Sequence, residues 1–141
     1  MIEYRFQTDK VDLKKVCDLY KTTGWWDEPC NTEQVSRLIS GSFCFITAWD
    51  NDNIMGMGRV ISDSFSDAYI QDVFVEEKYR KQGIANNIVS RLMNYCKEKN
   101  IHWIALIAAP GSTGVYEKLG FEKMGEHTPM LFKKKAIGFE I

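Results

Sequence analysis

The sequence predicts a mixed α/β domain, in which helices flank a mostly antiparallel central sheet that contains one parallel strand–helix–strand pair. The 141 residues, 45% of them hydrophobic, are enough for one core, and we expect a single domain over residues 1–141. Three successive stretches before residue 76 have strand character and are joined by short polar turns. A loop, an amphipathic helix and another apolar stretch then follow over residues 76–107, an order typical of a right-handed parallel unit.

Composition excludes several classes of protein. With 18 basic and 19 acidic residues the formal net charge is −1, so a basic nucleic-acid-binding face is not expected. No apolar run approaches the roughly 18 residues of a membrane span, and the polar first ten residues do not resemble a signal peptide. We therefore expect no nucleic-acid or membrane partner. The oligomeric state that we expect is a monomer or a homodimer.

Cysteine and histidine usage indicates a reducing compartment and no metal. The four cysteines lie far apart, with no Cys-x-x-Cys pair, which fits reduced thiols in the cytoplasm better than zinc ligands or a disulfide framework. Only two histidines are present, so a metal site is not expected. We expect His102 to be structural rather than catalytic.

The first 41 residues predict one strand and two helices. Apolar Ile2, Tyr4 and Phe6 alternate with polar residues, as in a half-buried strand. Helical apolar spacing follows over residues 11–20 and again over residues 35–39. The expected caps are Thr8 or Asp9 for the first helix and Thr32 for the second, and the expected stops are Gly24 and Gly41.

Two adjacent tryptophans, Trp25 and Trp26, lie between these helices and precede Glu28. Exposing two large rings is unfavourable unless something covers them. They either form the wall of a binding site for an aromatic or aliphatic acceptor, or one ring fills the core while the other packs on the adjacent helix.

A hairpin is predicted next. Residues 43–49 and 53–61 have strand patterns and flank a run of turn formers, Asp50 to Asn53. Residues 62–67 form the next turn and lead into a strand that begins near Tyr69.

The stretch from Tyr69 to Cys96 predicts an anion site. The strand ends in Val73, Phe74 and Val75, and a polar loop of Arg80, Lys81, Gln82 and Gly83 precedes a helix. The first backbone N–H groups of a helix lack intrahelical partners and carry partial positive charge, so a phosphate is a natural ligand there. The alternative is an ordinary loop whose glycine begins a helix.

The last third predicts a covered central strand at residues 101–107, then a short helix and two strands. Ser112 or Thr113 is the expected cap of that helix and Gly120 its stop. The strands are expected at Phe121 and at residues 130–132. Lys133 to Lys135 then form either a solvated strand end or a basic patch.

Two motifs resemble those of the GCN5-related N-acetyltransferase (GNAT) family. The first is Arg80-Lys81-Gln82-Gly83-Ile84-Ala85, which is similar to the family's Gln/Arg-x-x-Gly-x-Gly/Ala signature; the second is the Tyr-x-x-x-Gly-Phe element at residues 116–121. The resemblance covers the whole chain and implies a GNAT fold that binds acetyl-CoA. Stretches at residues 19–25 and 58–63, with Met130, are similar to bacterial and plant members of the arylalkylamine type.

The resemblance also implies a cofactor site. Its residues would be Val73, Phe74, Val75, Arg80, Lys81, Gln82, Gly83, Ile84, Ala85 and Asn86. The loop would bind the pyrophosphate, and the main chain at residues 73–75 would pair with the pantetheine arm and polarise the thioester carbonyl. One position departs from the family: Ala109 stands where many members carry Asn, so a side-chain hydrogen bond to pantetheine is not expected.

Acyl transfer to an amine needs a base for the ammonium proton and an acid for the departing thiolate. The resemblance makes Tyr116 the expected acid; the alternative is a tyrosine that only packs. Asp72 and Glu28 are possible bases, although strand carboxylates often form salt bridges and a water relay would also serve. Trp25, Trp26 and Glu28 are the expected acceptor-binding residues.

We therefore expect an acetyl-CoA-dependent N-acetyltransferase that acetylates a small-molecule primary amine by direct attack in a ternary complex. No cysteine falls in either motif, which argues against a covalent intermediate. The alternatives are a noncatalytic acyl-CoA-binding or protein-interaction module, and an acetyltransferase for protein lysines or N-termini.

Overall fold

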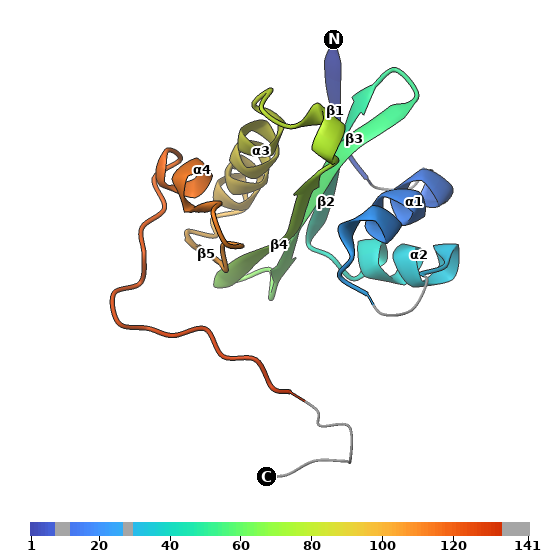
Figure 1. Ribbon diagram of the computed structural model, residues 1–141. Coiled ribbons are helices and arrows are strands. Elements are labelled where there is room, and N and C mark those ends of the chain that lie inside the picture. The colour runs from blue at the N-terminus through green and yellow to red at the C-terminus, as the bar shows by residue number, and fades with distance from the viewer. Residues whose placement is uncertain (8–11, 27–29, 134–141) are drawn as a thin grey trace.

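The computed structural model describes residues 1–7, 12–26 and 30–133. A five-stranded sheet in the order β1-β2-β3-β4-β5 forms its centre (Figure 1). The strands are β1 (Ile2–Phe6), β2 (Cys44–Asp50), β3 (Asn53–Ser62), β4 (Asp67–Val75) and β5 (Trp103–Leu106). The helices are α1 (Leu13–Thr23), α2 (Thr32–Ser40), the 3₁₀ helix η1 (Glu77–Tyr79), α3 (Ile84–Glu98) and α4 (Thr113–Glu117). The first four strands pair antiparallel and β4 pairs parallel with β5, which confirms the predicted fold class.

Helices cover the two faces of this sheet (Figure 1). On one face α3 buries Ile88 and Leu92 against the strands, and on the other α1 and α2 pack with Phe45 and Met57. Gly58 of β3 permits the close approach of α3, because a Cβ there would lie 2.7 Å from the Ile88 Cγ2 atom. Burying apolar surface in these two layers stabilises the fold, at about 25 cal/mol per Å².

The N-terminal helices begin at residues other than those predicted. The Asp12 side chain caps α1 by accepting a hydrogen bond from the Lys15 amide, and Thr8 and Asp9 lie outside the described residues. In α2 the cap is Asn31, and Thr32 is the first helical residue. The prediction of Thr32 as the cap is therefore wrong, because the Asn31 side chain accepts from the Gln34 amide while the Gln34 side chain accepts from the Asn31 amide, a reciprocal capping box. Gly24 and Gly41 end the two helices as predicted.

The C-terminal third differs most from the prediction. β5 contains four residues rather than seven, and Trp103 is 44% exposed, so the strand is not covered on both faces. Phe121 and residues 130–132 do not form strands. A turn closed by the His127 amide and the Met124 carbonyl interrupts this segment, which leads away from the sheet in Figure 1.

The described segment after α4 forms no strand because strand-forming side chains stabilise a strand only when a neighbouring strand pairs with it. Within the described chain no such partner exists for the segment after α4. Lys133 is exposed but ends no strand, and Lys134 and Lys135 lie outside the described residues. Among the residues described, no helix combines the length and apolar character that crossing a membrane requires.

Candidate active site

A β-bulge shapes the middle of β4. Met57 pairs with Phe74 and Arg59 with Gln71, so Asp72 and Val73 together oppose the single residue Gly58. Asp72 has φ +54°, a left-handed conformation that is uncommon for a residue with a side chain. Such bulges re-aim side chains and are frequent beside active sites.

Beyond this bulge β4 separates from β5. Their parallel pairing ends at Ile70 with Leu106, so within the described chain residues 71–75 have no partner strand on that side. The main chain at residues 73–75 therefore faces no partner strand of the described chain along this edge, where the Val75 carbonyl accepts a hydrogen bond from Arg80. The side chains of Val73 and Val75 pack with the core beneath α3, and Phe74 packs on the opposite face, so only their main chain can meet a ligand at the edge.

The loop after β4 leads directly into the N-terminus of α3. Gly83 precedes the helix with φ +78°, and no side chain caps the first turn. The first intrahelical bond runs from the Asn87 amide to the Gly83 carbonyl. The amides of Ile84, Ala85 and Asn86 are thus left for an external acceptor, which is the arrangement that binds anions.

The basic residues of this loop have different roles. Arg80 donates from Nε to the Val75 carbonyl at 2.8 Å, and its guanidinium lies 5.4 Å from the Phe74 ring centroid. It therefore ties the loop to the end of β4. Lys81 and Gln82 are exposed and available to a ligand, whereas Ile84 is buried and can offer only its amide.

Asp72 lies at the centre of a polar network on the other face of the sheet. Its Oδ2 atom accepts a hydrogen bond from the Tyr20 hydroxyl at 2.9 Å and from Arg59 Nε at 2.8 Å. Burial, and then the Asp72 carboxylate, raise the pKa of Tyr20, so its phenol stays protonated and donates. The predicted base thus forms the salt bridge considered as its alternative role, while its Oδ1 atom has no hydrogen-bond partner among the described residues.

Both tryptophans lie in an aromatic cluster beside this network. Trp26 stacks on Tyr20 with centroids 4.7 Å apart and planes 9° apart, and Trp25 makes edge contacts with Tyr20 and Phe74. Trp25 is 46% exposed and Trp26 39% exposed, so neither ring fills the core. The cluster of Tyr20, Trp25, Trp26 and Phe74 therefore joins α1 to β4. The third expected acceptor residue, Glu28, lies outside the described residues.

Tyr116, the expected acid, comes from α4 on the face that α3 covers. Its ring packs at the edge of the core and makes an edge contact with Phe121, with centroids 5.9 Å apart. Its hydroxyl has no hydrogen-bond partner among the described residues, and burial raises the pKa of Tyr116 above its ordinary value. Its phenol is therefore a protonated donor at neutral pH.

Sequence reasoning missed Tyr20 and Arg59, which hold Asp72. The helical spacing marks Tyr20 as an apolar position of α1 and gives no sign of its partner 52 residues away. The turn after β5 is formed by Ser112, whose amide and hydroxyl donate to the Ala109 carbonyl. Among the described residues, no group of three or more His, Cys, Asp or Glu side chains could hold a metal ion.

Comparison with known proteins gives consistent matches. The family model for the acetyltransferase (GNAT) domain matches residues 11–130. GCN5-related N-acetyltransferase 2, chloroplastic, from Arabidopsis thaliana is 35% identical over 136 residues, which cover 82% of this chain and 51% of that protein. The chain spans less than two thirds of the length of several curated relatives that it matches.

Two solved structures have the same fold. A GNAT-family acetyltransferase from Streptococcus pneumoniae is 27% identical with a TM-score of 0.79, covering 96% of this chain and 99% of that one. A predicted acetyltransferase from Clostridium acetobutylicum, solved with acetyl-CoA, is 22% identical with a TM-score of 0.68, covering 93% and 96% of the two chains.

Proposed function

The chain belongs to the GNAT acetyltransferase family, and we propose that it transfers the acetyl group of acetyl-CoA to a small primary amine by direct attack in a ternary complex. One observation carries the proposal: the uncapped N-terminus of α3 follows directly on the strand edge that β5 leaves unpaired. These two features offer an anion site and a row of backbone donors and acceptors in one continuous stretch, residues 71–86.

The main chain would hold most of the cofactor. The amides at residues 84–86 and the positive loop suit the pyrophosphate, because the aligned peptide dipoles favour negative charge there. Gly83 leaves this approach open, since a Cβ there would meet only the Asn87 side chain, at 4.0 Å. Along residues 73–75 the free edge would pair with the pantetheine amides as an added strand does.

Tyr116 would give its proton to the departing sulfur. Acetyl-CoA supplies the activated thioester, and the amide groups at the free β4 edge would polarise its carbonyl oxygen. A phenol whose pKa burial keeps high is protonated across the physiological range and so serves as the acid.

Asp72 would attract the acceptor ammonium and take its proton, directly or through water. An alkylammonium with a pKa of about 10.4 arrives charged, so a carboxylate beside it is favourable. Arg59 and Tyr20 hold the Oδ2 atom of Asp72 and leave Oδ1 for this contact. The bulge brings this carboxylate next to the aromatic cluster.

A small amine with an apolar group fits this cluster best. The partly exposed faces of Trp25 and Trp26 offer a surface for stacking and for cation–π contact with an ammonium. We propose an arylalkylamine-like acceptor, with Glu28 as a further acceptor residue. We also propose that residues 1–141 form a single domain, that the protein is a monomer or homodimer, and that it acts in the cytoplasm.

The test is an acceptor screen read by mass spectrometry of the acetylated product. The screen pairs an arylalkylamine with a lysine-containing peptide of similar size, both with acetyl-CoA. We expect product from the arylalkylamine, and Tyr116→Phe should lower turnover by about 10²- to 10⁴-fold while acetyl-CoA binding persists. Binding without turnover on any amine would instead support the noncatalytic module, and product only from the peptide would support a protein acetyltransferase.

A further inference from the structure

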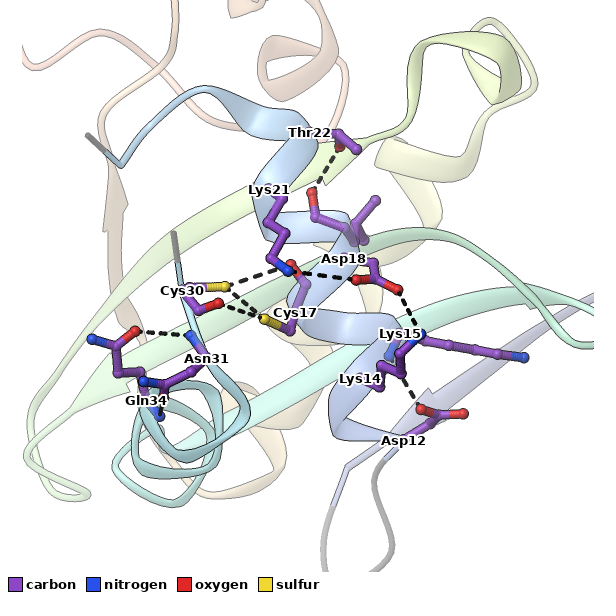
Figure 2. Close-up of polar contacts among 11 residues, drawn as sticks. Asp12, Lys14, Lys15, Cys17, Asp18, Lys21, Thr22, Cys30, Asn31 and Gln34 are labelled. Atoms are coloured by element: carbon purple, nitrogen blue, oxygen red, sulfur yellow. Dashed lines mark hydrogen bonds and ion pairs between the residues drawn. The ribbon is translucent and has the colours of Figure 1, made fainter. Parts of the chain in front are cut away.

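Two cysteines that are 13 residues apart in the sequence meet in the core that α1 and α2 form with the sheet. The Sγ atoms of Cys17 in α1 and Cys30, just before α2, lie 2.9 Å apart (Figure 2). The Cys17 thiol also donates to the Cys30 carbonyl at 3.1 Å, and the Cys30 thiol lies 3.5 Å from the Cys17 carbonyl. These contacts aim the two side chains at each other.

The pair is buried and shielded. Cys17 is 3% exposed and Cys30 5%, inside the core that α1 and α2 form with the sheet. The other two cysteines, Cys44 and Cys96, are equally buried in the opposite core. Within the described chain their sulfur atoms form no hydrogen bond with each other, so the close contact is particular to the first pair.

We propose that Cys17 and Cys30 form a reversible disulfide that joins α1 to the start of α2 across the segment carrying Trp25 and Trp26. The present separation exceeds an S–S bond of about 2.05 Å by roughly 0.9 Å. Closing this gap brings the two sulfur atoms to bonding distance.

A peroxide is the oxidant that balances the reaction. The Cys30 sulfur attacks one peroxide oxygen, an S–O bond forms as the O–O bond breaks, and the thiol proton leaves with the other oxygen as water. The Cys17 sulfur then displaces the oxygen on Cys30, which departs as a second water with the Cys17 proton. The two thiols lose two electrons in total, and a dithiol reductant reverses the change.

The environment of Cys30 makes this reaction slow and pH-dependent. Burial, and then the neighbouring Cys17 thiol, raise the pKa of Cys30 to about 11, although the Lys21 ammonium opposes them. The thiolate is the reactive form, so oxidation should accelerate as the pH rises towards that value. Such a pair suits a reversible structural disulfide better than it suits a catalytic role.

The Cys17–Cys30 disulfide would constrain the loop between α1 and α2. Cys17 and Cys30 are 13 residues apart in the chain, and Tyr20, on which Trp26 stacks, lies one helical turn after Cys17. Closing this loop restricts the unfolded chain and should raise Tm by roughly 10 °C. The effect on acceptor affinity rests on the proposed function, whereas disulfide formation does not.

The experiment treats the purified protein with hydrogen peroxide, blocks remaining thiols after denaturation and maps the peptides by mass spectrometry. We expect a Cys17–Cys30 linked peptide that dithiothreitol removes, together with the rise in Tm. Cys17→Ser should abolish both. The matched control Cys44→Ala/Cys96→Ala removes the other buried pair and should retain both.

The proposal is overturned if oxidised wild-type protein contains four free thiols, or if the linked peptide joins other cysteines. The wild-type map gives this answer even where a variant fails to fold. If the disulfide forms while no amine is acetylated in either redox state, the disulfide proposal stands and the proposed function fails. If acetylation proceeds and no disulfide forms, the proposed function stands and the disulfide proposal fails.

Discussion

Replacing Gly83 by Asp and by Asn tests the anion site at α3 with a matched pair of side chains. The two side chains have nearly the same shape, and both tolerate the left-handed conformation that φ +78° requires. They differ by one negative charge at the helix N-terminus. An added Cβ meets no atom closer than 4.0 Å, so the backbone has room for it in both variants.

The charge should have opposite effects on folding and on binding. Two like charges at 4 Å repel by about 1 kcal/mol in water, so a carboxylate facing the two charges of a pyrophosphate weakens binding by about 2 kcal/mol, or roughly thirtyfold. The same carboxylate stabilises the ligand-free helix by about 0.3–1 kcal/mol through the macrodipole.

Calorimetric titration with acetyl-CoA and urea unfolding measure the two effects separately. We expect Gly83→Asp to be at least as stable as Gly83→Asn yet to bind acetyl-CoA roughly thirtyfold more weakly, with the difference shrinking at high salt. Equal affinities of the two variants would refute a phosphate site at this helix.

Three further predictions concern stability. Gly58→Ala should destabilise the protein by about 1–3 kcal/mol in urea unfolding, because its Cβ would lie 2.7 Å from Ile88, whereas Gly114→Ala, with open space around it, should be neutral or stabilising; equal effects would contradict the packing argument. Tyr20→Phe should cost about 1–2 kcal/mol by leaving Asp72 without one hydrogen bond, and an unchanged urea midpoint would count against that bond. The Ser66 hydroxyl and three backbone amides hold the pKa of Asp63 well below its ordinary value, so its contribution is present above about pH 4 and is lost as the pH falls further. Asp63→Asn should therefore be less stable than the wild type at pH 6, by a difference that shrinks steadily as the pH falls below about 4, and a constant difference would contradict this assignment.

Local patterns predicted the elements whose partners are close in sequence. The β2–β3 hairpin follows from the turn formers at Asp50 to Asn53, and α3 follows from the apolar spacing that begins at Ile84. The order of strand, polar loop and helix was enough to predict the uncapped N-terminus. These features depend on short-range geometry.

Tertiary features were not predictable in the same way. The bulge at Asp72 depends on a register shift against β3, and no residue type in β4 indicates it. The Cys17–Cys30 contact depends on how two helices pack, and their spacing in the sequence predicted separate thiols. The strand expected at residues 130–132 did not form, because a strand-like composition does not determine a pairing partner.

The stretch from the β4 edge to the first turn of α3 is the proposed binding site of acetyl-CoA. The most direct measurement is a titration of ¹⁵N-labelled protein with CoA, followed through its backbone amide resonances. We predict the largest shifts at the amides of residues 73–75 and 81–86, with saturation at a single site. Saturable shifts confined to other strands or helices, or no shifts at all, would contradict the account.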